Sequence, residues 1–143
     1  MKRLLDYILE SEEKEKKFNG FAILKPGFLD NRKDFEQLLK DNDWSIIKKE
    51  KTKLSNSDAK NLYDCHKDED YFTDLCDYMS SDDCYIYNLH KDCENPIEDL
   101  KKVKDEARKK WGKDEMKNCM HSSDSKENVE RESKICFDVN KKK

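Results

Sequence analysis

One apolar run constrains the fold of this chain more than any other feature: Phe21-Ala22-Ile23-Leu24, closed by Lys25-Pro26-Gly27. A short continuous apolar segment that ends at Pro and Gly is typical of a central buried strand. Charged residues make up 44% of the 143 residues and the hydrophobic class 34%, a balance that approaches that of disordered chains. The apolar residues are nevertheless clustered and periodic, which predicts one folded domain with a highly charged surface.

Helical and strand patterns alternate after this run. The elements expected next are helix 35–42, strand 44–54, helices 59–66 and 72–79, strand 85–87, helix 96–111, strand 117–120 and helix 129–137. When the two neighbouring helices are counted as one unit, the order is βαββαβ. This order predicts an α+β fold with a ferredoxin-like core, in which helices cover one face of a four-stranded antiparallel sheet.

The two ends of the chain differ from the middle. Apolar residues at helical spacing over 1–8, followed by a charge run, predict an amphipathic helix and a charged connector over 1–17. The lysines near the C-terminus predict a solvated basic tail over 139–143, which leaves 18–138 as the folded domain.

Composition indicates which partners and which cellular location to expect. The net charge is -3 with interspersed charges, so no basic stripe favours a nucleic-acid partner. No apolar run approaches the length of a membrane span, and residues 1–9 do not form a secretory signal. Six cysteines without a C-x-x-C pair predict free thiols and a cytoplasmic location (Cys65, Cys76, Cys84, Cys93, Cys119 and Cys136).

The stretch Asn118-Cys119-Met120-His121-Ser122-Ser123-Asp124-Ser125 places His121 where a strand is expected to stop and a helix to begin. Asp124 and Glu127 have the spacing of an N-cap residue and a carboxylate at the third helical position. Free backbone N–H groups at such a helix start suit an anion, and a neutral imidazole is a good nucleophile. From spacing alone, a histidine that merely caps or fills the turn is favoured.

This stretch, with Glu132 eleven residues after His121, resembles the active-site segment of nucleoside diphosphate kinases. The resemblance runs from about Phe18 to Phe137 and identifies the domain as a divergent member with a shortened lid region. It implies a ferredoxin-like core, in agreement with the order of elements. It also implies transfer of the γ-phosphate of a nucleoside triphosphate to a nucleoside diphosphate through phosphohistidine at His121. Mg²⁺ would enter with the nucleotide phosphates.

The resemblance assigns catalytic roles to four residues. His121 is the nucleophile, and Glu132 accepts a hydrogen bond from its ring. Lys25, in the Lys-Pro pair after the first strand, reaches the terminal phosphate. Tyr63, which begins Tyr63-Asp64-Cys65-His66-Lys67-Asp68, lies beside the imidazole.

Further residues are assigned to nucleotide binding by the same resemblance. Tyr71 stands where the family has a Phe that stacks on the nucleobase, and any flat ring can serve this purpose. Arg108, thirteen residues before His121, has the spacing of a phosphate-binding arginine. The complete set is Lys25, Tyr71, Leu75, Arg108, Lys117 and Asn118, with Asn118 expected at the ribose hydroxyls.

Several positions depart from the family pattern. The region 90–104 is several residues shorter than usual and lacks the family's second Arg and its Thr. Lysines 101, 102 and 104 could supply charge there, but not a bidentate fork. Ser122 replaces the usual Gly, and Glu115 adds a carboxylate before the histidine. These changes imply weaker nucleotide binding or altered geometry, and they leave the family's trimer or hexamer in doubt.

Three other interpretations stay open. A nucleoside diphosphate kinase-like scaffold without activity would explain the degraded lid, although a mere core would need none of the polar residues retained at the site. A metal site could use Cys65 with His66, or His90 with Cys93, but neither spacing gives a closed tetrahedral set. Nucleic-acid binding through Tyr85 and Tyr87 would need a basic field, which the acidic balance does not provide.

Overall fold

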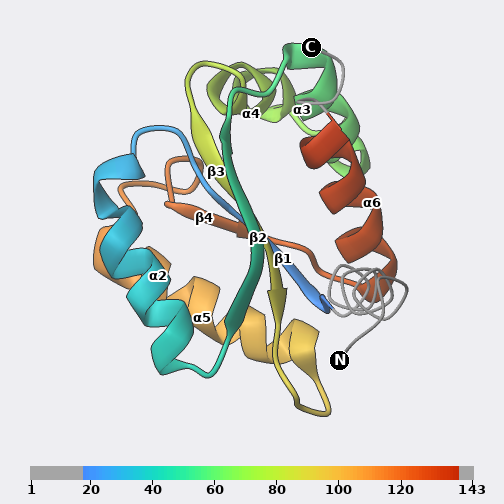
Figure 1. Cartoon of the computed structure of the whole chain (residues 1–143). Helices are drawn as coiled ribbons and strands as arrows, with labels where there is room; N and C mark the ends of the chain where they lie inside the picture. The colour runs from blue at the N-terminus through green and yellow to red at the C-terminus, as the bar shows by residue number, and fades with distance from the viewer. Residues whose placement is uncertain (1–17, 139–143) are drawn as a thin grey trace, which may run out of the picture.

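The sheet confirms the expected fold class. In the computed structural model, which describes residues 18–138, four antiparallel strands lie in the order β2-β3-β1-β4 (Figure 1). Their bounds are β1 Gly20–Leu24, β2 Ser45–Thr52, β3 Cys84–His90 and β4 Met120–Ser122. The amphipathic helix expected over 1–17 and the basic tail over 139–143 lie outside the described residues.

Strand β1 is central, as its unbroken apolar sequence predicted. It pairs with β3 on one side and β4 on the other, so that Ile23 lies opposite both Ile86 and His121. All five of its residues are buried. This strand therefore connects the candidate site, at its C-terminal end and on β4, to the middle of the core.

Helices cover both faces of the sheet, so the expectation of helices on one face was wrong. Helices α2 (Arg32–Asp41) and α5 (Pro96–Trp111) pack on one face, where Ala22 and Leu24 point (Figure 1). Helices α3 (Asn56–Leu62), α4 (Phe72–Met79) and α6 (Lys126–Asp138) pack on the other, against Phe21 and Ile23. The βαββαβ pattern accounts for the first pair of helices. The other three cover the second apolar face of β1, which would otherwise be exposed.

The bounds of one helix and one strand near the candidate site differ from expectation. The helix expected over 59–66 ends at Leu62, and a separate 3-10 turn spans Asp64–His66. Strand β4 begins at Met120 rather than at Lys117, because residues 113–118 form a turn in which Asp114 accepts backbone N–H groups of Met116 and Lys117. As a result, His121 lies within β4 and not at its end.

The start of α6 also differs by one residue. The Ser125 hydroxyl, not the Asp124 carboxylate, accepts the backbone N–H of Asn128 at 3.1 Å. Asp124 instead accepts the side-chain amide of Asn128 at 2.7 Å. Ser125 therefore acts as the N-cap of α6, a role for which a serine hydroxyl is as suitable as a carboxylate.

Two further observations concern the described chain as a whole. None of its helices combines the length and the apolar character needed to cross a bilayer. All six cysteines lie in the described part, and none is paired in a disulfide. Cys65 and Cys93 are exposed, and the other four are buried as small apolar side chains.

Candidate active site

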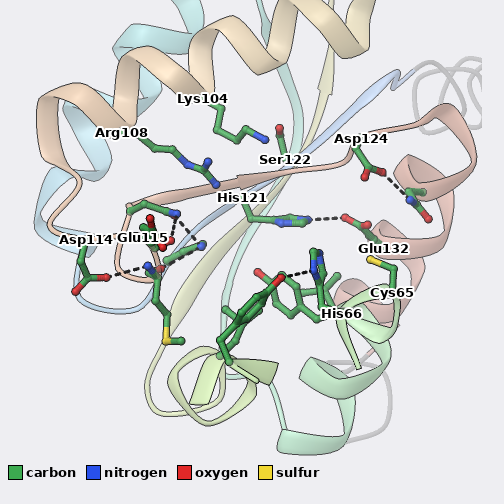
Figure 2. A pocket seen from close by; sticks show the side chains of 18 residues that line it. Cys65, His66, Lys104, Arg108, Asp114, Glu115, His121, Ser122, Asp124 and Glu132 are labelled. Carbon is green, nitrogen blue, oxygen red and sulfur yellow. Dashed lines mark hydrogen bonds and ion pairs between the residues drawn. The ribbon is translucent and has the colours of Figure 1, made fainter. Parts of the chain in front are cut away.

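A pocket of about 740 Å³ brings together residues that are far apart in the sequence. Its floor is formed by the end of β1 and by β4, and its walls by α5 on one side and by the α3–α4 segment on the other (Figure 2). Eight of the nine candidate residues line it: Lys25, Tyr63, Tyr71, Leu75, Arg108, Asn118, His121 and Glu132. The ninth, Lys117, does not line the pocket, and its ammonium lies 6.0 Å from the centre of the Tyr78 ring.

His121 and Glu132 form a short polar contact in the pocket. The His121 Nε2 lies 2.6 Å from the Glu132 Oε1, and the Ser123 hydroxyl donates to the same oxygen at 2.8 Å. Because an ionised carboxylate only accepts, this contact puts the ring proton on Nε2 and leaves the lone pair on Nδ1. The Glu132 side chain is 5% exposed and that of His121 17%, so the ring is reachable while its partner is not.

Burial controls the protonation of the ring. Removal from water lowers the pKa of His121 below its usual value, and the nearby ammonium groups of Lys25 and Lys104 lower it further. The carboxylate of Glu132 opposes this shift through its hydrogen bond and its charge. The ring is therefore neutral at pH 7, which is the form that has a free lone pair.

The ring of Tyr63 packs against the ring of His121. Its ring meets that of His121 edge to face, with centroids 5.3 Å apart and planes at 76°. Its hydroxyl is buried and has no hydrogen-bond partner among residues 18–138. Burial, followed by the charge of Glu132, raises the pKa of Tyr63 well above its usual value, so the hydroxyl keeps its proton as a donor.

Lys25 extends from the end of β1 into the pocket. Its ammonium donates to the Asn118 Oδ1 at 2.8 Å and to the Met116 carbonyl at 3.3 Å. The residue is 4% exposed. Desolvation, followed by repulsion from Arg108, lowers the pKa of Lys25 to about 7.

The lowered pKa of Lys25 makes anion binding pH-dependent. At pH 8 the free protein holds this amine mainly neutral, and a bound phosphate would raise its pKa and cause it to take up a proton. We expect ADP binding at pH 8 to take up as much as about one proton, and at pH 6 much less, because Lys25 is then already charged. Titration calorimetry in two buffers of different ionisation enthalpy measures this uptake, and Lys25→Met should reduce it. Equal heats in both buffers at pH 8 would contradict the prediction.

Helix α5 contributes Arg108 and Lys104. One guanidinium nitrogen of Arg108 donates to the Met120 carbonyl at 3.2 Å, while its buried Nε has no partner among the described residues. Lys104 lies one turn earlier on the same helix and also lines the pocket. The sequence had suggested Lys104 only as one of three possible charges. Its spacing of four residues places it on the same side of α5 as Arg108.

His66 and Tyr71 form a contact at the rim of the pocket that the sequence did not predict. The His66 Nδ1 lies 2.7 Å from the hydroxyl of Tyr71, and the two rings are tilted with centroids 5.8 Å apart. Tyr71 is 43% exposed, the most open large hydrophobic side chain among the described residues. A flat ring held at the mouth of the pocket suits stacking against a planar group. Within the described chain, no three His, Cys, Asp or Glu residues converge to hold a metal ion.

Backbone strain lies close to the histidine. Cys119, two residues before His121, has a φ of 80°, a conformation that favours glycine. Its carbonyl accepts the backbone N–H of Lys25 at 2.9 Å. Non-glycine residues in this region cost on the order of 1–3 kcal/mol and persist where the surroundings enforce them. This kink turns the chain from the 113–118 turn into β4 and fixes the relative position of Lys25 and His121.

Fold and site together define an α+β domain of the ferredoxin-like class, with a carboxylate-bound histidine on the floor of a pocket that also holds Lys25, Lys104 and Arg108. A family model for nucleoside diphosphate kinase matches residues 19–141. A nucleoside diphosphate kinase of Salinibacter ruber is 31% identical over 128 residues, which cover 81% of this chain and 89% of the relative. The chain belongs to the nucleoside diphosphate kinase family.

Two other comparisons extend this finding. A protein of Xenopus laevis named thioredoxin domain-containing protein 6 is 27% identical over 133 residues, which are 81% of this chain and 21% of that protein. The crystal structure of the Aquifex aeolicus nucleoside diphosphate kinase superposes with a TM-score of 0.71 over 82% of this chain and 93% of that chain. At 22% sequence identity, this likeness concerns the fold.

Proposed function

We propose that this protein moves the γ-phosphoryl group of a nucleoside triphosphate to a nucleoside diphosphate through a phosphohistidine at His121. The observation that carries the proposal is the 2.6 Å contact between the His121 Nε2 and the buried Glu132, in a pocket that also holds three cationic side chains. Attack on a phosphate requires a neutral ring with a fixed tautomer, and cationic groups close by stabilise the charge that develops.

In the first half-reaction, the Nδ1 lone pair of His121 attacks the γ-phosphorus. An N–P bond forms, and the bond from that phosphorus to the bridging oxygen breaks. The nucleoside diphosphate leaves with the bonding electrons and with the Mg²⁺ that accompanied the nucleotide as part of the substrate. A second nucleoside diphosphate then attacks the phosphohistidine by the reverse route, which restores the free ring.

The remaining candidate residues have roles that fit their positions. Lys25 and Arg108 would bind phosphate oxygens and share the charge that develops in the transition state. Tyr63 would donate its free hydroxyl near the ring. Tyr71 and Leu75 would hold the nucleobase at the mouth, and Asn118, now bound to Lys25, would reach the ribose hydroxyls.

We also propose that residues 18–138 form the functional unit and that the protein acts in the cytoplasm. Hydrogen bonds that organise the pocket join residues within this range. The unpaired cysteines are consistent with a reducing compartment.

The proposal predicts a phosphorylated protein. Incubation with radiolabelled ATP and Mg²⁺ should give up to one labelled phosphate per chain, stable to alkali and lost in acid, because the N–P bond of phosphohistidine is acid-labile. Addition of a nucleoside diphosphate should remove the label and yield the triphosphate. If no acid-labile phosphate appears, the proposal fails, and the interpretation as a nucleoside diphosphate kinase-like scaffold replaces it.

A further inference from the structure

Lys104 occupies a special place on α5. Two of its neighbours, Val103 and Ala107, are buried against the sheet, whereas Lys101 and Asp105 are exposed. Lys104 itself is half-buried, and Figure 2 shows its side chain and that of Arg108 pointing from the helix into the pocket above His121. One helix thus directs two cationic groups to the same part of the pocket.

The pocket leaves these cations without ionic partners. No ion pair joins Lys25, Lys104 or Arg108 to any carboxylate of residues 18–138, although four carboxylates line the same space. Three of these four are already engaged by other groups: Asp114 by backbone N–H groups, Asp124 by Asn128, and Glu132 by His121 and Ser123.

Lys104 also differs from the other two cations in its hydrogen bonding. Lys25 donates to two oxygens and Arg108 to one, but no hydrogen bond from Lys104 to another described residue is formed. Burial and the neighbouring Arg108 lower the pKa of Lys104, and the charges of Asp105 and Asp124 oppose this shift only in part. An ammonium group held half-buried without a partner is unfavourable unless an anion joins it.

We propose that Lys104 binds the phosphate group that is transferred, and that with Arg108 it replaces on one helix the contacts that a longer lid would supply. This inference rests on the proposed function, because it names a phosphate-contacting residue for the same site. An ammonium is a compact point charge on a flexible stem, so it can follow the phosphoryl group from the departing oxygen to the ring nitrogen. Such a contact is stronger in the transition state, where negative charge shifts between the phosphate oxygens, than in the bound substrate. It therefore accelerates the reaction.

The test compares three variants with the parent protein. Lys104→Met removes the charge and keeps the length of the side chain, and Lys104→Arg restores the charge. Lys101→Met is the matched control, because Lys101 lies on the same helix, is exposed and does not line the pocket. Two quantities are measured for each: the rate of phosphoenzyme formation at saturating ATP and Mg²⁺, and the affinity for inorganic pyrophosphate by titration calorimetry.

We expect Lys104→Met to lower both quantities roughly 10-fold, the effect of losing one charge-assisted phosphate contact. Lys101→Met should stay near the parent, and Lys104→Arg should recover most of the loss. A merely structural role would not be rescued by charge in this way. Circular dichroism checks folding, and Lys104→Gln provides a second neutral variant if the Met side chain perturbs the helix.

The experiment distinguishes a failure of the proposed function from a failure of the assignment of Lys104. If the parent forms no phosphoenzyme but binds pyrophosphate, the proposed function is wrong, and the pyrophosphate affinities alone decide on Lys104. If Lys104→Met matches Lys101→Met in both measurements, the assignment of Lys104 is overturned while the proposed function stands. A parent that binds no pyrophosphate overturns the assignment as well.

Discussion

Substitution His121→Ala is expected to abolish phosphoryl transfer from ATP to a second nucleoside diphosphate. The imidazole is the group that forms the covalent intermediate in the proposed mechanism, and alanine offers no nucleophile in its place. The loss should therefore reach the detection limit rather than a partial value, and the acid-labile label should disappear with it. A coupled assay of triphosphate formation measures the first effect, and mass spectrometry of the labelled peptide containing residue 121 measures the second.

His90→Ala is the matched control for this experiment. His90 lies at the end of β3, does not line the pocket and contacts Asp92 at 3.6 Å. Its loss should leave both transfer and labelling unchanged. If His121→Ala transferred phosphate at the parent rate, the imidazole would have no part in the reaction, and the site would have to be sought elsewhere.

Substitution Glu132→Gln should reduce the rate of phosphoenzyme formation by about 100-fold, or about 2.7 kcal/mol of barrier. Both His121 and Ser123 bind the same oxygen, Oε1, so the amide oxygen of glutamine can accept both hydrogen bonds in the same geometry. The substitution therefore keeps the tautomer and the position of the ring. It removes the negative charge and, with it, the 3.8 Å ion pair of Oε2 with Arg131. That charge is most valuable when the ring becomes positive during attack.

Glu130→Gln serves as the control, because Glu130 lies two residues earlier on α6 and is exposed. It should retain the parent rate. Glu132→Ala should be more damaging than Glu132→Gln, since it also frees the ring to rotate and leaves the Ser123 hydroxyl without its acceptor. Equal rates for parent and Glu132→Gln would show that orientation alone, and not charge, is what Glu132 provides.

Much of the fold could be predicted because it depends on short-range patterns. The apolar run of β1 and the helical spacing over α5 are local signals, and each marked its element correctly. The number of covered faces depends instead on how distant segments pack. The packing of α3, α4 and α6 on the second face of β1 joins segments more than thirty residues apart, which local patterns do not reveal.

The contacts of the candidate site also include some that the sequence predicted and some that it did not. His121 and Glu132 could be paired from sequence because the resemblance to the family assigns both of them, and one short strand-to-helix unit carries the two residues. The contact between His66 and Tyr71 could not, because it depends on a 3-10 turn where a continuous helix was expected. The position of Lys104 required the packing of α5 against the sheet, which decides which of three nearby lysines enters the pocket.

The shortness of β4 has a consequence for the stability of the site. This three-residue strand lies at the edge of the sheet and pairs with β1 alone, whereas β1 has a neighbour on each side. Local opening that detaches β4 would break three residue pairs and carry the histidine out of register, while the rest of the core could stay intact. A ligand that bridges α5, β1 and β4 would oppose this opening, by about 2.7 kcal/mol at a concentration 100 times its Kd. Amide hydrogen exchange along β4 would then slow on ligand binding and report the occupancy of the pocket.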